Sequence, residues 1–141
     1  PDHGWDIPAR RDFLIDVIRE LKEAGRRVSL FIDHEPRMAE EAAKVGADRV
    51  ELYTGPYATD FSLLPAYVET AKAAQQAGLG INAGHDLNLD NLAKFIAAIP
   101  MCDEVSIGHA ITADALKMGW AGAVSAYLTA IRYGQKSAKA A

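Results

Sequence analysis

The chain has 141 residues, of which 50% are apolar and 24% charged, a composition typical of one globular domain with a sizeable core. Its formal net charge of −4 and isoelectric point near 5.5 argue against nucleic acid as a partner, because a phosphate backbone requires a basic surface. The single cysteine excludes an internal disulfide and agrees with a cytoplasmic protein, and the absence of an apolar run of roughly 18 residues argues against a membrane partner.

The first predicted helix follows a short polar lead. Asp6 can cap this helix, Pro8 suits its first turn, and Gly25 ends it. Between them apolar residues recur at helical spacing, at positions 13, 14, 17, 18 and 21. Residues 28–32 then form a continuous β-branched or aromatic run, which predicts a strand covered on both faces.

The same unit of helix, glycine, short apolar strand and polar turn recurs along the chain. Further strands are predicted at residues 49–53, 79–82 and 104–107. Further helices are predicted at residues 36–45, about 63–77, 92–99, 111–116 and 120–133. Asn88 or Asp90 is the expected cap of the helix at 92–99. Residues 54–58 are predicted to form a turn-rich loop, and residues 135–141 a frayed end.

Four strands that begin at intervals of roughly 20 to 30 residues indicate a βα repeat, with parallel strands joined by helical crossovers. Two α/β architectures use this repeat, the doubly wound open sheet and the (β/α)8 TIM barrel. Both place function at the carboxyl ends of the strands. Four strands cannot close a barrel of eight, so in a barrel this chain would supply about half of the ~250 residues of the usual fold.

Two histidines follow predicted strands directly. His85 comes after the small residues 82–84, which let the backbone approach a ligand and leave the imidazole projecting from the strand end. Gly108 and His109 lie between a strand and a short helix, where free N–H groups can bind phosphate. The structural alternative for His85 is a loop histidine that only bonds to a neighbouring carbonyl group. The alternative for Gly108 and His109 is a tight strand-to-helix turn that simply needs a glycine.

Glu51 is the third candidate, because it lies inside a strand with Val50 and Leu52 on the opposite face. A carboxylate there is costly to bury unless it is paired or used. In an open sheet it could be an edge charge, and in a barrel it would lie inside, near the mouth. Asp33 and His34 are weaker candidates, since Asp33 can simply cap the next helix.

Metal binding would require His85, His109, Asp33 and Glu51 to converge. No pair of these residues has the i, i+4 spacing of a helical zinc site, and a glycine-rich dinucleotide fingerprint is also missing. Neither a metal nor another cofactor is therefore expected. His3 lies in the polar lead and is expected to be solvated.

Four segments together resemble the C-terminal half of the pyridoxine 5′-phosphate synthase family. They are Val28-Ser-Leu-Phe-Ile-Asp33, Val50-Glu-Leu-Tyr-Thr-Gly-Pro-Tyr-Ala58, Ile81-Asn-Ala-Gly-His-Asp-Leu87 and Ile107-Gly-His-Ala-Ile111. The resemblance runs in order over essentially the whole chain. The Asn-Ala-Gly-His and Ile-Gly-His-Ala-Ile segments make the resemblance specific when they occur together, whereas either segment alone would be a weak signal.

The resemblance implies a (β/α)8 TIM barrel with extra helices, in which residues 1–141 form the C-terminal half of a single domain, assembled as a homo-octamer. It also implies an enzyme of vitamin B6 biosynthesis without cofactor. This transferase condenses 1-deoxy-D-xylulose 5-phosphate with 3-amino-2-oxopropyl phosphate, and its products are pyridoxine 5′-phosphate, inorganic phosphate and water.

Residue roles follow from the same resemblance. His85 would be the proton donor for hydroxyls expelled as water, and Glu51 would stabilise positive charge in the transition state. Asp86, Gly108 and His109 would bind the substrates, the last two at a phosphate. Many relatives have glycine where Asp86 stands, which implies a backbone contact at that position.

The family's N-terminal half carries an Asn-x-Asp-His stretch and further catalytic groups, a histidine and a glutamate among them. None of these is in the sequence, whose first residue is Pro1 and not Met, so the chain is expected to be a piece of a longer protein. By itself it is expected to be inactive, with open sheet edges that tend to associate. The alternatives are another phosphate-binding α/β protein, either a barrel isomerase or aldolase, or a non-catalytic binding module.

Overall fold

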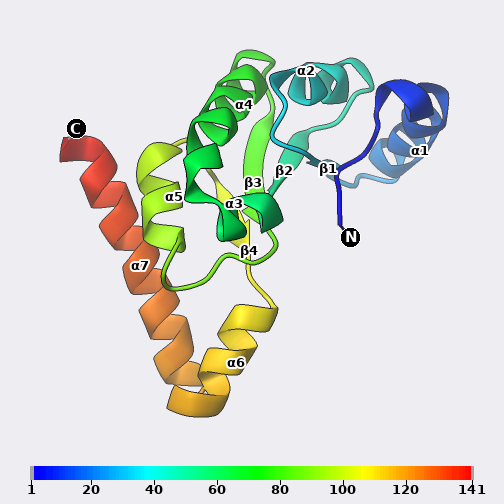
Figure 1. The fold of residues 1–141 in the computed structure, drawn as a ribbon. Coiled ribbons are helices and arrows are strands. Elements are labelled where there is room, and N and C mark those ends of the chain that lie inside the picture. Colours follow the sequence, from blue (N-terminus) through cyan, green and yellow to red (C-terminus); the bar gives the residue numbers. More distant parts are fainter. Residues whose placement is uncertain (1, 141) are drawn as a thin grey trace.

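A computed structural model describes residues 2–140, and its centre is one parallel sheet (Figure 1). The sheet contains four strands: β1 (Ser29–Ile32), β2 (Arg49–Tyr53), β3 (Gly80–Gly84) and β4 (Glu104–Ser106). Their spatial order is β1-β2-β3-β4, and every neighbouring pair is parallel. The predicted βα repeat is therefore confirmed, and the fold is consistent with part of a (β/α)8 barrel.

Helices connect the strands and extend the chain beyond the last one (Figure 1). The α-helices are α1 (Arg11–Glu23), α2 (Pro36–Lys44), α3 (Gly55–Thr59), α4 (Leu64–Gln76), α5 (Leu92–Ala98), α6 (His109–Met118) and α7 (Trp120–Ala140). Two 3-10 turns, η1 (Pro8–Arg10) and η2 (Phe61–Leu63), precede α1 and α4. Within residues 2–140 no helix is long and apolar enough to cross a membrane.

The prediction of a loop at residues 54–58 is wrong, because all of this segment but Thr54 lies in the short helix α3. Pro56 in its first turn is compatible with a helix start, where a missing N–H group costs nothing. The buried ring of Tyr57 packs against Tyr67 and Phe95, so tertiary contacts stabilise a helix that would be too short to persist alone.

The prediction of a frayed C-terminal segment is also wrong for residues 135–140, because α7 continues to Ala140. Its alanines and lysines favour helix, and α7 packs along α5. Gly134 makes this close approach possible, since a Cβ atom there would lie 2.5 Å from the carbonyl oxygen of Ala93. Ala141 lies outside the described residues.

The helix caps differ in part from expectation. The carboxylate of Asp33 does not cap α2 but accepts a hydrogen bond from the Gly4 N–H (3.0 Å). Asn88, not Asp90, organises the turn before α5, because its side-chain oxygen accepts from the N–H groups of Asp90 (2.9 Å) and Asn91 (3.2 Å). Asp6 accepts from the Ala9 N–H (3.2 Å), but this bond is made to the 3-10 turn η1, and the N-cap of α1 is Arg10.

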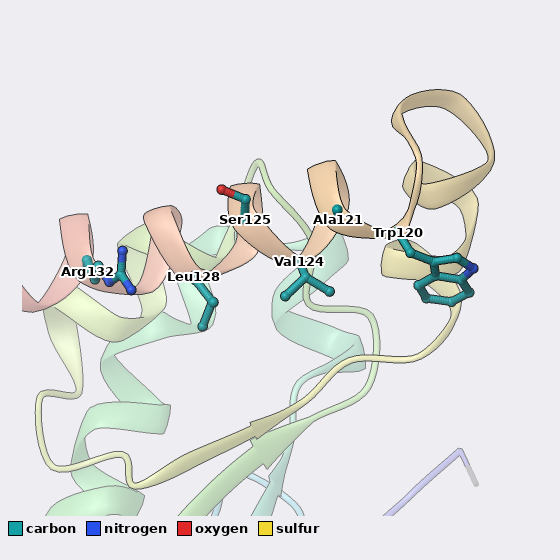
Figure 2. A pocket seen from close by; sticks show the side chains of 6 residues that line it. All are labelled: Trp120, Ala121, Val124, Ser125, Leu128 and Arg132. Carbon is teal, nitrogen blue, oxygen red and sulfur yellow. The ribbon is translucent and has the colours of Figure 1, made fainter.

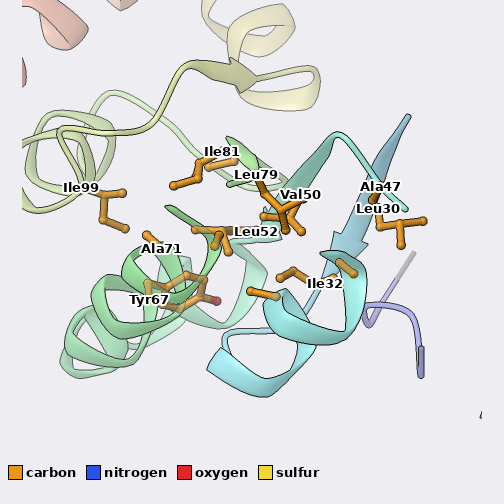
Figure 3. Close-up of a cluster of buried hydrophobic side chains, with 14 of the residues drawn as sticks. Leu30, Ile32, Ala47, Val50, Leu52, Tyr67, Ala71, Leu79, Ile81 and Ile99 are labelled. Carbon is orange, nitrogen blue, oxygen red and sulfur yellow. The ribbon is translucent and has the colours of Figure 1, made fainter. Parts of the chain in front are cut away.

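The hydrophobic core lies on the face of the sheet that α2 and α4 cover (Figure 3). Alternate strand residues point into it, and the buried positions include Leu30, Ile32, Val50, Leu52 and Ile81. The residues between them point to the other face, so strand periodicity assigns Phe31, Glu51 and Tyr53 to the side away from the core.

Candidate active site

The candidate site is built around a left-handed turn at the carboxyl end of β3. His85 has φ = 79° and Asp86 has φ = 59°, a region that side-chain-bearing residues rarely occupy. The turn brings His85 Nδ1 to 2.9 Å from the Oδ2 atom of Asp86. In the tautomer in which Nδ1 donates its hydrogen to this carboxylate, Nε2 is free to exchange a proton with a ligand.

Aromatic rings border His85 on the side of β2 and β1. The Tyr53 ring meets the imidazole edge-on with centroids 5.0 Å apart, and the Phe31 ring lies 5.2 Å from that of Tyr53. The Tyr53 ring, with Phe31 packed against it, limits the directions in which the imidazole can turn.

Glu51 lies on β2, a central strand, so the alternative of an edge charge is wrong. Its carboxylate is half-buried and packs over Gly84, the residue before His85. Burial, followed by the negative charge of Glu104, raises the pKa of Glu51 above its ordinary value of 4.5. Glu51 and His85 line one cleft of about 840 Å³, together with Phe31, Trp5 and Arg10.

A second cleft, of about 690 Å³, lies on the other side of His85. His85 and Asp86 line one part of it, and Gly108 and His109 at the start of α6 line another. The first N–H groups of a helix have no partner inside it and attract anions, so this end of α6 is suited to a phosphate group. His85 is thus shared by two clefts that differ in their other polar groups.

The structure brings the five predicted site residues to one end of the sheet: Glu51 and His85 in one cleft, and His85, Asp86, Gly108 and His109 in the other. Asp33 and His34 follow β1 at the same end of the sheet but line neither cleft, since Asp33 binds Gly4 and His34 stacks on Tyr67 with centroids 4.7 Å apart. His3 is exposed, as expected. Among residues 2–140, no three His, Cys, Asp or Glu side chains gather so as to hold a metal ion.

The sequence did not reveal two parts of the site. The carboxylate of Asp86 contacts the His85 ring, and the sequence did not indicate this; the backbone contact expected at Asp86 was one with substrate. Thr54, directly after β2, is fully buried and binds the backbone of the His85 turn. A polar residue directly after a strand was a visible signal for Thr54, but nothing in the sequence indicated its partner.

Gly84 is expected to matter for the position of Glu51 and much less for folding. A Cβ atom at this residue would collide with Oε1 of Glu51, the mobile end of a flexible side chain. We therefore expect Gly84→Ala to fold but to displace the Glu51 carboxylate. Any catalytic turnover that depends on this carboxylate should then fall on the order of 10²-fold. Thermal unfolding would measure the stability of the variant, and steady-state kinetics would measure its turnover. A variant with full turnover would show that the position of the Glu51 carboxylate beside Gly84 does not matter for catalysis.

A parallel βα repeat that gathers its polar side chains at the carboxyl ends of the strands defines the class of α/β proteins to which doubly wound sheets and (β/α)8 barrels belong. Within that class, the family model described as "Pyridoxal phosphate biosynthesis protein PdxJ" matches residues 1–133, so the chain belongs to this family. The family resemblance inferred from the four sequence segments is confirmed.

Several curated relatives named pyridoxine 5′-phosphate synthase are similar to this chain. The protein of Albidiferax ferrireducens is 50% identical over 140 residues, which cover 95% of this chain and 56% of the relative. Those of Brucella anthropi (49% over 137 residues) and Cytophaga hutchinsonii (50% over 134 residues) each cover 92% of this chain and 56% of the relative. The chain thus spans about half the length of the curated relatives it matches.

Proposed function

We propose that this chain is part of a pyridoxine 5′-phosphate synthase, which joins 1-deoxy-D-xylulose 5-phosphate and 3-amino-2-oxopropyl phosphate to form pyridoxine 5′-phosphate, phosphate and water. The observation that carries the proposal is the position of His85 between two clefts, one containing Glu51 and the other bounded by Gly108 and His109. One proton-transfer group shared by two clefts suits a reaction that joins two substrates and expels water.

In this proposal His85 donates a proton to a departing hydroxyl group. The contact between Nδ1 and Asp86 supports the role, because it orients the ring and leaves Nε2 to carry the transferred proton. Glu51 stabilises positive charge on imine-like intermediates. Its half-buried position supports this role, since a charge acts more strongly where water is partly excluded.

The start of α6 is the proposed phosphate site, with Gly108, His109 and, at the rim, Asp86 in contact with substrate. The cleft and the free N–H groups of the first helical turn support this assignment. The ligands proposed here are the phosphate group of a substrate and the inorganic phosphate that the reaction releases.

We further propose that residues 1–141 form the C-terminal half of a single barrel domain and are inactive without the other half. β1 and β4 end the sheet among the described residues, and α7 presents an apolar stripe of Trp120, Val124 and Leu128 (Figure 2). Trp120 is 62% exposed, a large apolar surface that a neighbouring segment would cover. A cytoplasmic homo-octamer is the proposed assembly, by analogy with the family.

The test of this function is a synthase assay with the protein as its own gene encodes it. Incubation with both substrates should yield pyridoxine 5′-phosphate and inorganic phosphate together, and omission of either substrate should abolish both products. Phosphate binding that His109→Ala abolishes, with no condensation in any form of the protein, would instead support a non-catalytic binding module.

Gly108 offers a test of the phosphate site alone. A Cβ atom there would meet nothing within 4 Å and the residue has φ = −110°, so Gly108→Ala should leave the fold intact. Because the methyl group would obstruct the approach of a phosphate to the helix start, we expect about a tenfold rise in KM for a phosphorylated substrate, or ~1.4 kcal/mol. Gly122→Ala, on α7 outside this cleft, is the control and should leave KM unchanged.

A further inference from the structure

We infer that Thr54, acting together with Asn91, is a positioning residue that holds His85 in its reactive orientation. The inference rests on the proposed function in that His85 is the proton donor. It concerns two residues outside the proposed catalytic and substrate-binding set, both of them almost completely removed from solvent: Thr54 is 0% exposed and Asn91 is 1% exposed.

Thr54 binds the peptide groups on both sides of the His85 Cα atom. Its N–H donates to the carbonyl oxygen of Gly84 (2.9 Å), and its hydroxyl lies 2.7 Å from the same oxygen. The hydroxyl also contacts the carbonyl oxygen of His85. Because these two carbonyl groups flank the φ and ψ bonds of His85, the contacts restrict the backbone torsions that aim the imidazole.

Asn91 extends the same restraint by one residue. Its side-chain N–H group donates to the carbonyl oxygen of Asp86 (3.2 Å), and its side-chain oxygen accepts from the Asn88 N–H (2.8 Å). The Tyr57 hydroxyl, from α3, donates to the Asn91 carbonyl oxygen (3.1 Å). The three consecutive carbonyl groups of residues 84–86 are thus all bound by these two buried residues. The Thr54 N–H binds that of Gly84, the single hydroxyl hydrogen of Thr54 is shared between those of Gly84 and His85, and Asn91 binds that of Asp86.

These contacts explain how the left-handed turn persists. Two successive residues that carry side chains have positive φ, a conformation that survives only where the surroundings hold it. The turn in turn brings Nδ1 of His85 to the Asp86 carboxylate. If the Thr54 hydroxyl were lost, we expect the turn to relax and the imidazole to leave this geometry, although Thr54 itself lines neither cleft.

Thr70 provides a matched control within the same chain. It is also 0% exposed, but its hydroxyl donates to the Ala66 carbonyl oxygen (2.9 Å) within α4 and has no contact with the His85 turn. Thr54→Val and Thr70→Val therefore each remove one buried hydroxyl at constant shape. Thr54→Ser removes a methyl group and keeps the hydroxyl.

The experiment compares these three variants in the protein as its own gene encodes it, with synthase kinetics and the NMR signals of the His85 ring across a pH titration. We expect Thr54→Val to lower kcat on the order of 10²-fold with little change in KM, because a misplaced catalytic group costs about this much. Its His85 ring signals should shift, Thr54→Ser should recover most of the activity, and Thr70→Val should match the unsubstituted protein.

Equal decreases in kcat in Thr54→Val and Thr70→Val would overturn the inference, because the removal of any buried hydroxyl group would then explain both decreases. Unchanged His85 ring signals in Thr54→Val would overturn it as well, whatever the kinetics. If the unsubstituted protein had no synthase activity, the proposed function would fail, while the ring signals would still decide whether Thr54 positions His85.

Discussion

Replacement of His85 by asparagine is expected to lower kcat by about 10²- to 10⁴-fold while substrate binding changes little, since this is the usual contribution of a positioned general acid. Asparagine can still offer an N–H group to the cleft, but it cannot donate a proton to a leaving hydroxyl. Steady-state kinetics with both substrates, together with equilibrium binding of each, would separate the two effects.

His34→Asn is the control for this variant, because it makes the same change in another βα loop. His34 stacks on Tyr67 and lines neither cleft that contains His85, so its loss should leave kcat close to that of the unsubstituted protein. If His85→Asn kept its full turnover number, His85 would have no role as proton donor.

Glu51→Gln is expected to lower kcat on the order of 10²-fold and to raise stability at neutral pH. Glutamine keeps the shape of the side chain but removes the charge that would stabilise a cationic intermediate. The same carboxylate is costly to the fold, because burial and the charge of Glu104 disfavour its ionised form. Steady-state kinetics at pH 7 would measure the expected decrease in kcat, and thermal unfolding at the same pH would measure the expected increase in stability.

The pH dependence of stability provides the control for this variant. The pKa of Glu51 is raised in the folded state, so folding favours the protonated carboxyl group. The contribution of Glu51 to the free energy of unfolding therefore decreases as the pH rises from 4.5, the ordinary pKa of a glutamate, through the raised pKa of the folded state. The extra stability of Glu51→Gln should be present at pH 7 and shrink as the pH falls toward 4, and a variant less stable at pH 7 would contradict this account.

The location of the site was predictable because the relevant signals are local. An apolar run of four or five residues followed by polar ones identifies the carboxyl end of a strand, and parallel strands bring those ends to one edge of a sheet. His85, Gly108 and His109 were found in this way, and Glu51 was found from its alternation with Val50 and Leu52. The structure places all of them beside one or both clefts.

The errors lay where local preference and tertiary contacts disagree. Residues 54–58 have turn-forming composition, yet the burial of Tyr57 stabilises the short helix α3. Asp33 has the chemistry of a helix cap, but the polar lead runs beside β1, where the Trp5 N–H donates to the Phe31 carbonyl oxygen (2.9 Å), and the carboxylate binds Gly4 instead. Neither outcome follows from a window of neighbouring residues.

By itself the sequence determined the βα repeat, the parallel sheet, the family and the strand ends that carry the candidate site, because periodicity and glycine position act over a few residues. Only the tertiary structure decided how His85 is aimed. Thr54 is 30 and 31 residues from the carbonyl groups that it binds, and Tyr57 is 34 residues from Asn91. Such contacts depend on the packing of two βα loops against each other, and packing between distant segments leaves no periodic trace in a single sequence.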